Sequence, residues 1–110
     1  KGDGGLEKDQ EHAFVWAEKA AEAGMEEAQW HVAGMYFSGA GVEKDVKKAA
    51  EWYRRAAEQG YGEAQHCYAE LLFEGDGVEK DRKEAEKFYL LAAEQGVTLA
   101  QHKLGIIYLM

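Results

Sequence analysis

The sequence has 110 residues, of which 46% are hydrophobic and 31% are charged, and its formal net charge is −8. Acidic side chains are spread along the chain without a basic stripe, which argues against nucleic acid and against an anionic membrane surface as partners. The single cysteine, Cys67, excludes an intrachain disulfide, and no apolar run reaches the length of a transmembrane helix, so we expect no membrane insertion.

The first predicted element is an amphipathic helix between Asp9 and Gly24. Its apolar residues follow the i, i+3, i+4, i+7, i+8 spacing of one helix face: Ala13, Trp16, Ala17, Ala20 and Ala21. Asp9 is predicted to cap the helix start, because a carboxylate can accept hydrogen bonds from the unpaired N–H groups of the first turn. Gly24 is predicted to end the helix in the left-handed conformation.

A second type of helix is predicted to begin at the pair Ala28-Gln29. Its apolar face consists of Ala28, Val32, Met35 and Tyr36. Ala33 supplies a small side chain on a neighbouring face, where helices can approach closely. The segment 39–44 is predicted to be a linker in which Val42 points inward. From Asp45 to Gly60 the first type of helix returns, with the apolar stripe Ala49, Trp52, Tyr53, Ala56 and Ala57.

All of these patterns return at a fixed step. The pair Ala28-Gln29 recurs as Ala64-Gln65 and as Ala100-Gln101, so the period is 64 − 28 = 100 − 64 = 36 residues. A constant period of this size is typical of a solenoid of stacked helical hairpins. The predicted fold is therefore all-α, a right-handed superhelix of antiparallel helix pairs with six helices and no strands. Its units are a partial repeat at 1–27, full repeats at 28–63 and 64–99, and a partial repeat at 100–110.

The repeated sequence motifs resemble the Sel1-like repeat, a relative of the tetratricopeptide repeat. The best copy contains Ala28-Gln29, Tyr36, Gly39-Ala40-Gly41-Val42, Asp45, Lys48-Ala49, Trp52-Tyr53 and Ala56-Ala57-Glu58-Gln59-Gly60. The resemblance covers nearly the whole chain. Two departures concern packing: Ala33 and Ala69 stand where the family favours glycine. In the first copy, Asp3-Gly4-Gly5 replaces the Gly-x-Gly of the linker.

The resemblance implies a scaffold or adaptor that binds a protein or peptide partner, because Sel1-like proteins assemble complexes in bacterial signalling and host contact or in endoplasmic-reticulum quality control. The family has no common catalytic site. An alternative is the enzyme-like role in cell-wall or β-lactam chemistry that has been suggested for cysteine-rich members. Those members carry paired cysteines in each repeat, whereas this chain has only Cys67. A third possibility is a structural spacer within a larger protein.

The residues themselves suggest no catalytic, cofactor or metal site. The glycine pairs of the linkers lack the preceding strand and the Gly-Lys-(Ser/Thr) of a phosphate-binding loop. Four histidines, His12, His31, His66 and His102, are spread over separate repeats, where shared tetrahedral zinc ligation is awkward. Cys67 follows His66 directly, so on a helix the two side chains point about 100° apart and do not form a nucleophile–base pair by spacing. We therefore expect no cofactor and no catalysis.

The candidate partner-binding surface is the stripe opposite the apolar face of the Ala-Gln helices. In successive repeats its three positions hold Trp30, Gly34 and Phe37, then His66, Glu70 and Phe73, then His102, Ile106 and Leu109. We expect this stripe to line the concave face and to receive an extended peptide or a partner helix, because large apolar residues on a solvent-facing surface can mark a binding groove. The alternative for Phe37, Phe73 and Leu109 is that they pack between adjacent repeats.

The last residues, 106–110, are mostly apolar and have no second helix to cover them. Terminal repeats of solenoids normally carry a polar outer face. We therefore expect either a longer array or another chain stacking on this end, with end-to-end or swapped self-association through this helix in concentrated solution.

Overall fold

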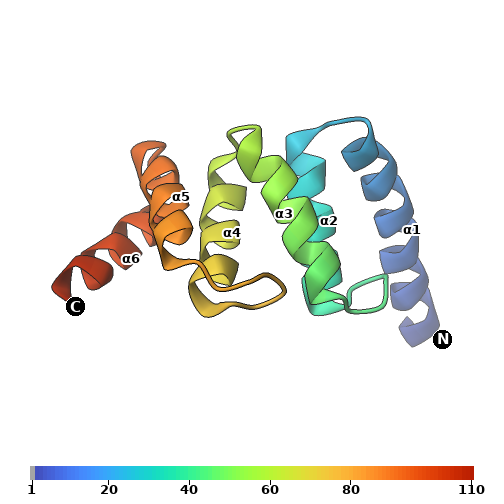
Figure 1. The fold of residues 1–110 in the computed structure, drawn as a ribbon. Coiled ribbons are helices and arrows are strands. Elements are labelled where there is room, and N and C mark those ends of the chain that lie inside the picture. Colours follow the sequence, from blue (N-terminus) through green and yellow to red (C-terminus); the bar gives the residue numbers. More distant parts are fainter. Residues whose placement is uncertain (1) are drawn as a thin grey trace.

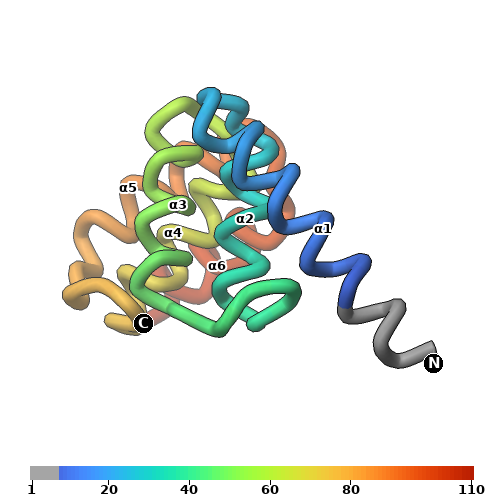
Figure 2. The backbone as a smooth tube through the Cα atoms, turned by 90° about the vertical axis from the view of Figure 1, so that its right-hand side faces the viewer, coloured from blue at the N-terminus to red at the C-terminus, as the bar shows by residue number. Residues whose placement is uncertain are grey.

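The computed structural model describes residues 2–110, with side chains described from Lys8 onward, and these residues form six helices and no strand. The helices are α1 (Gly2–Glu22), α2 (Glu26–Ser38), α3 (Val46–Glu58), α4 (Gly62–Glu74), α5 (Arg82–Glu94) and α6 (Thr98–Leu109). Each helix packs against the next in an elongated array with extents of 51 × 24 × 24 Å (Figure 1). Figure 2 views the same array after a 90° turn, with α1 nearest the viewer and α6 behind. The predicted all-α solenoid is confirmed.

Glycine ends the helices where the sequence predicted it. Gly24, Gly60 and Gly96 have φ values of 100°, 98° and 91°, the left-handed region that glycine adopts without steric cost. After α3, the N–H of Gly60 donates to the carbonyl of Ala57 at 3.0 Å, and the N–H of Tyr61 donates to the carbonyl of Ala56 at 3.1 Å. This hydrogen-bond pair is a Schellman motif, which satisfies carbonyls that the helix end would leave unpaired.

Two aspartates begin helices as predicted. The carboxylate of Asp45 accepts a hydrogen bond from the N–H of Lys48 at 3.1 Å, and Asp81 caps α5 in the same way. The N–H of Asp45 also donates to the carbonyl of Tyr36 at 2.9 Å. Because Tyr36 belongs to the preceding helix α2, this bond ties the end of the linker to the helix before it.

The prediction that Asp9 caps the first helix is wrong. Asp9 lies inside α1, which begins at Gly2 and therefore also includes residues 3–5, expected as linker. Asp45 is also bonded to the preceding helix α2, whereas Asp9 lies within one continuous helix.

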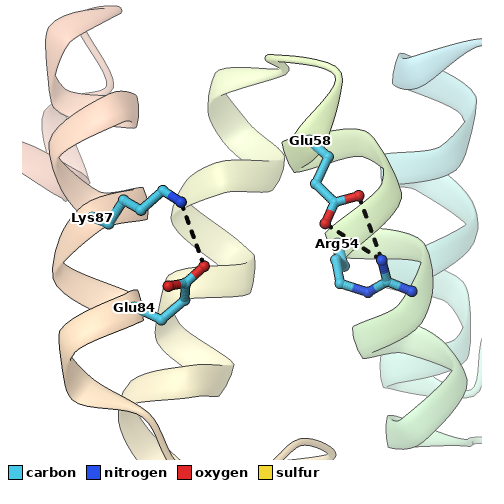
Figure 3. A network of polar contacts seen from close by, with 4 residues as sticks. All are labelled: Arg54, Glu58, Glu84 and Lys87. Atoms are coloured by element: carbon cyan, nitrogen blue, oxygen red, sulfur yellow. Dashed lines mark hydrogen bonds and ion pairs between the residues drawn. The ribbon is translucent and has the colours of Figure 1, made fainter.

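The start of α5 forms only half of a capping box. Asp81 accepts from the N–H of Glu84 at 3.0 Å, but its own N–H donates to the carbonyl of Leu72 rather than to the Glu84 side chain. The Glu84 carboxylate pairs with the ammonium of Lys87 at 3.7 Å (Figure 3). The reciprocal bond of a capping box is therefore replaced by the bond that holds the linker to α4.

The core consists of alanines at which neighbouring helices meet and of aromatic rings between them. Alanines 33 and 69 are fully buried, as their small-residue position predicted, while at the same position in α6 a side chain on Gly105 would meet open space. The linker valines Val42 and Val78 are half-buried against this core, also as predicted. Close approach of the helix backbones at the alanines keeps the stack narrow and leaves the larger side chains to shape its faces.

Buried glutamines connect consecutive repeats. The side chain of Gln65 donates to a carbonyl of α3 and accepts a hydrogen bond from Nε2 of Gln95 at 3.0 Å. Gln95 Nε2 also donates to the carbonyl of Gly60 at 2.7 Å. Gln29 and Gln59 make the same contact one repeat earlier, at 2.8 Å. The glutamine of the Ala-Gln pair thus bonds to the repeat before it and to the glutamine that follows the other helix of its own repeat, a role that was not predicted from the sequence.

In the part of the chain that the structure describes, no helix is both long enough and apolar enough to span a bilayer.

Candidate functional site

A groove of about 450 Å³ lies on the face formed by α2, α4 and α6. This volume falls within the range of about 300–1,000 Å³ that is usual for ligand sites. Its lining residues are Phe37 from α2, Tyr53 from α3, His66, Cys67, Glu70 and Leu71 from α4, and Leu99, His102, Lys103 and Ile106 from α6. The groove therefore brings together five of the nine predicted stripe residues: Phe37, His66, Glu70, His102 and Ile106.

A smaller hollow of about 260 Å³ continues the same face over α2. It is lined by Trp30, His31, Gly34, Met35, Ser38 and Tyr53. Because Tyr53 lines both hollows, the two adjoin at its side chain. Trp30 is half-buried here against the rings of His31 and Tyr61, and its Nε1 atom is buried without a hydrogen-bond partner among the described residues. Trp30 therefore packs against neighbouring rings and also lines the hollow.

Phe73 does not line the groove, although the sequence analysis placed it on the stripe. It is 8% exposed, whereas Phe37 at the same position one repeat earlier is 39% exposed. The guanidinium of Arg82 lies 4.0 Å and the ammonium of Lys103 lies 4.7 Å from the centre of the Phe73 ring. These two cations cover the ring. The alternative of packing between repeats therefore describes Phe73, while Phe37 is open to the groove and Leu109 is exposed at the end of α6.

Gly34 and Glu70 occupy equivalent positions and decide how two buried tyrosines meet the surface. A Cβ atom on Gly34 would lie 3.6 Å from the hydroxyl of Tyr53, so only the absence of a side chain leaves that hydroxyl open to the hollows. One repeat later Tyr89 is fully buried, and burial together with the nearby carboxylate of Glu70 raises the pKa of its hydroxyl. Glycine at this position therefore leaves the Tyr53 hydroxyl beside the smaller hollow, whereas one repeat later the position is filled by Glu70, which itself lines the groove.

The groove floor is apolar and lies in a negative environment. Burial raises the pKa of the Cys67 thiol, and the nearby carboxylates of Glu70 and Glu63 raise it as well, against the opposing effect of polar contacts from Trp30 and Tyr53. Burial likewise raises the pKa of Tyr53 well above its usual range. An activated cysteine nucleophile needs the opposite shift, because the thiolate is the reactive form. These shifts favour binding over covalent chemistry.

Glu70 is the carboxylate that reaches the groove. Its Oε2 atom lies 3.3 Å from Nε2 of His66, one helical turn earlier, and its side chain is 42% exposed. Among the residues whose side chains the structure describes, no three His, Cys, Asp or Glu side chains are grouped as metal ligands would be. What the arrangement provides is an apolar cleft with one accessible carboxylate at its edge.

Five lining residues were absent from the predicted stripe: Tyr53, Cys67, Leu71, Leu99 and Lys103. Four of them lie on α4 or α6 beside stripe residues, so a wider stripe would have included them. Tyr53 is different, because it belongs to α3, a first-type helix, and reaches the face by passing between α2 and α4. A helical pattern on one helix carries no signal for such a contribution.

Comparison with known proteins identifies the repeat. The family model of the Sel1 repeat matches residues 1–25, 26–61, 62–97 and 98–110. Among curated proteins, none matches the sequence. The solved structure of c5321, a protective antigen of uropathogenic Escherichia coli with an SLR fold, is 40% identical over 89% of this chain, with a TM-score of 0.87. A Sel1 repeat protein from Oxalobacter formigenes is also 40% identical over 89% of the chain, with a TM-score of 0.85.

A third similar structure is cysteine-rich protein B of Helicobacter pylori, which is 27% identical over 81% of this chain and 67% of its own length, with a TM-score of 0.77. The chain spans 21% of the length of the Escherichia coli protein and 40% of that of the Oxalobacter formigenes protein. Sel1 repeats are generally protein-interaction modules. Since the repeat model matches from one end to the other and the helices stack as in these relatives, the chain belongs to the Sel1 repeat family.

Proposed function

We propose that the protein is a non-catalytic adaptor that binds a peptide segment of a partner protein in the groove across α2, α4 and α6. The observation that carries this proposal is an apolar groove spanning α2, α4 and α6, the three helices that contain an Ala-Gln pair, with Phe37 and Ile106 exposed in it. Apolar side chains left exposed in a concave site gain free energy when a partner removes them from water.

The distribution of repeated and variable residues supports the same proposal. The alanines, glycines and glutamines that hold the stack recur in every repeat, while the groove positions differ between repeats, as with His66 and Trp30 or Glu70 and Gly34. A stack that served only as a spacer would have no need of an open apolar groove. The enzyme-like alternative has less support, because the Cys67 thiol has a raised pKa.

A selection experiment with a matched control tests the proposal. A random peptide library displayed on phage is selected against the wild-type chain, and the enriched peptides are then assayed on Ile106→Asp and Leu90→Asp. Ile106 lies in the groove and is 43% exposed, whereas Leu90 lies on α5 outside it and is 40% exposed. We expect peptides that bind the wild type and Leu90→Asp but lose affinity for Ile106→Asp.

If the selection enriches no peptide, or only peptides that bind both variants equally well, the groove is not the binding site and the spacer role is favoured. Circular dichroism of both variants establishes that each one folds, so that lost binding reports the groove. The proposal would also be contradicted if Leu90→Asp, but neither the wild type nor Ile106→Asp, bound additional peptides.

We further propose that the outer face of α6 contacts a second copy of the chain in concentrated solution. Tyr108 on this face is 62% exposed, whereas Tyr36, its counterpart in α2, is 7% exposed because α3 covers it. The outer face of α1 offers the matching partner, since Trp16 is exposed there while its counterpart Phe88 is buried. Light scattering at increasing concentration should show association that Tyr108→Glu abolishes. A wild-type chain that stays monomeric at millimolar concentration would contradict this proposal.

A further inference from the structure

We propose that the occupant of the groove is a peptide segment in which a large aliphatic side chain is flanked by lysine or arginine. This inference rests on the proposed function and adds the chemistry of the ligand. It follows from two features of the groove, its apolar walls and the charges around its floor.

The aliphatic part of the ligand follows from the walls. Phe37, Leu71 and Ile106 come from three different helices and face the same cavity of about 450 Å³. Such a cavity is too large for a small side chain to fill, and an unfilled apolar cavity forfeits the contacts that would hold a ligand in it. A large aliphatic side chain can contact all three helices at once. Polar side chains placed there would lose their hydration without finding hydrogen-bond partners on these walls.

The basic part of the ligand follows from the charges that reach the floor. Besides burial, the carboxylates of Glu70 and Glu63 raise the pKa of the Cys67 thiol. The carboxylates of Glu70 and Glu74 likewise raise the pKa of the Tyr89 hydroxyl. All three glutamates project from α4, the central helix of the groove.

The ammonium of the lysine that lines the groove is directed toward Phe73. Lys103 lines the groove, but its ammonium makes a cation–π contact with Phe73, 4.7 Å from the centre of the ring. Glu70 is the carboxylate that lines the groove, with 42% of its side chain exposed and Nε2 of His66 at 3.3 Å from its Oε2 atom. A ligand ammonium or guanidinium beside the buried aliphatic side chain would pair with this carboxylate.

An acidic segment fits poorly for the same reason. Its carboxylates would lie beside the carboxylate of Glu70 at the edge of the groove, with Glu63 and Glu74 on the same helix outside the lining, and like charges repel. The net charge of −8 adds a longer-range field of the same sign, which slows the approach of acidic partners and speeds that of basic ones.

Three fluorescein-labelled peptides test the inference by fluorescence polarisation with the intact chain at physiological ionic strength. They are Gly-Lys-Leu-Lys-Leu-Gly, its acidic counterpart with Glu for Lys, and its polar counterpart with Ser for Leu. We expect the first peptide to bind about tenfold more tightly than either counterpart, a ratio that corresponds to one charge-assisted contact or one buried aliphatic side chain.

Charge reversal at Glu70 makes the test specific. In Glu70→Lys the preference should invert, so that the acidic peptide binds more tightly than the basic one. Glu70→Gln should bind the two about equally and serves as the milder variant if the reversal perturbs folding. Glu51→Lys is the matched control, because it changes the net charge by the same amount from an exposed position on α3 outside the groove. It should retain the wild-type preference.

The outcomes separate this inference from the proposed function. If the basic and acidic peptides bind the wild type equally, or if Glu51→Lys alters the preference as much as Glu70→Lys does, the inference is overturned. It is also overturned if phage selection yields peptides that depend on Ile106 but are not enriched in lysine or arginine. In that case the groove still binds peptides and the proposed function stands. Failure of the selection itself would remove both.

Discussion

Replacing Gly34 with alanine should stabilise the protein, although the position lies close to the side chain of Tyr53. Gly34 lies in the middle of α2, and its φ is not positive. A Cβ atom there would meet the Tyr53 hydroxyl at 3.6 Å, an ordinary contact distance that requires no movement. Alanine in a helix interior is more favourable than glycine by about 0.5–1 kcal/mol, chiefly because it restricts the unfolded chain. We therefore expect a gain of about that size in the free energy of unfolding.

Urea denaturation followed by circular dichroism measures this gain. With a slope of about 1–3 kcal/mol per molar urea for a small protein, the midpoint should rise by roughly 0.2–1 M. Gly77→Ala is the contrasting variant, because Gly77 has a φ of 76° and a Cβ there would lie 2.6 Å from the carbonyl oxygen of Val46. It should destabilise the chain by more than about 1 kcal/mol. A loss of stability in Gly34→Ala would refute the reasoning, because it would mean that glycine is kept at this position for packing rather than for the opening it leaves.

Three further predictions concern the stack and the groove floor. Gln65→Leu removes two side-chain hydrogen bonds of a buried residue and should cost about 1–3 kcal/mol in urea denaturation, whereas Gln101→Leu removes one exposed bond and should cost less than about 1 kcal/mol; equal losses would contradict the role assigned to the glutamine contacts. Burial raises the pKa of Tyr53, so the folded chain holds a proton that the unfolded chain releases near pH 10, and stability should fall as pH rises above about 10. Tyr53→Phe should make this alkaline loss less steep, and an unchanged slope would count against it. The raised pKa of Cys67 should make its alkylation by iodoacetamide at pH 8 slower than that of a free thiol, and bound peptide should slow it further because Cys67 lines the groove; alkylation at the free-thiol rate would contradict both expectations.

The fold could be predicted from the sequence because its determinants are local and repeated. Each helix carries its own apolar face, and each first-type helix ends in a glycine that adopts a positive φ. Asp9 marks the limit of this reasoning. Residues 7–9 and 43–45 have the same sequence, Glu-Lys-Asp, yet Asp45 caps a helix and Asp9 lies inside one. The difference comes from a bond to Tyr36 in the preceding helix, and such a contact has no signal within the three residues themselves.

The groove was partly predictable for a related reason. The stripe correctly brought His66, Glu70 and Ile106 together because their spacing places them on one side of parallel helices. It could not include Tyr53, whose contribution depends on how far a long side chain reaches between two helices. Spacing determines which residues share a face, but the openness of that face depends on the size of the side chains around it.

Phe37 and Phe73 show how the same residue in the same repeat position comes to have two roles. Phe73 is covered by Arg82 and Lys103, and the counterparts of these residues 36 positions earlier are Val46 and Cys67. Neither valine nor cysteine carries a cation that could cover an aromatic face, so Phe37 stays open and forms one wall of the groove. The groove therefore arises where one repeat lacks the charges that close the next, and binding specificity in this array depends on neighbours of a residue that is itself unchanged.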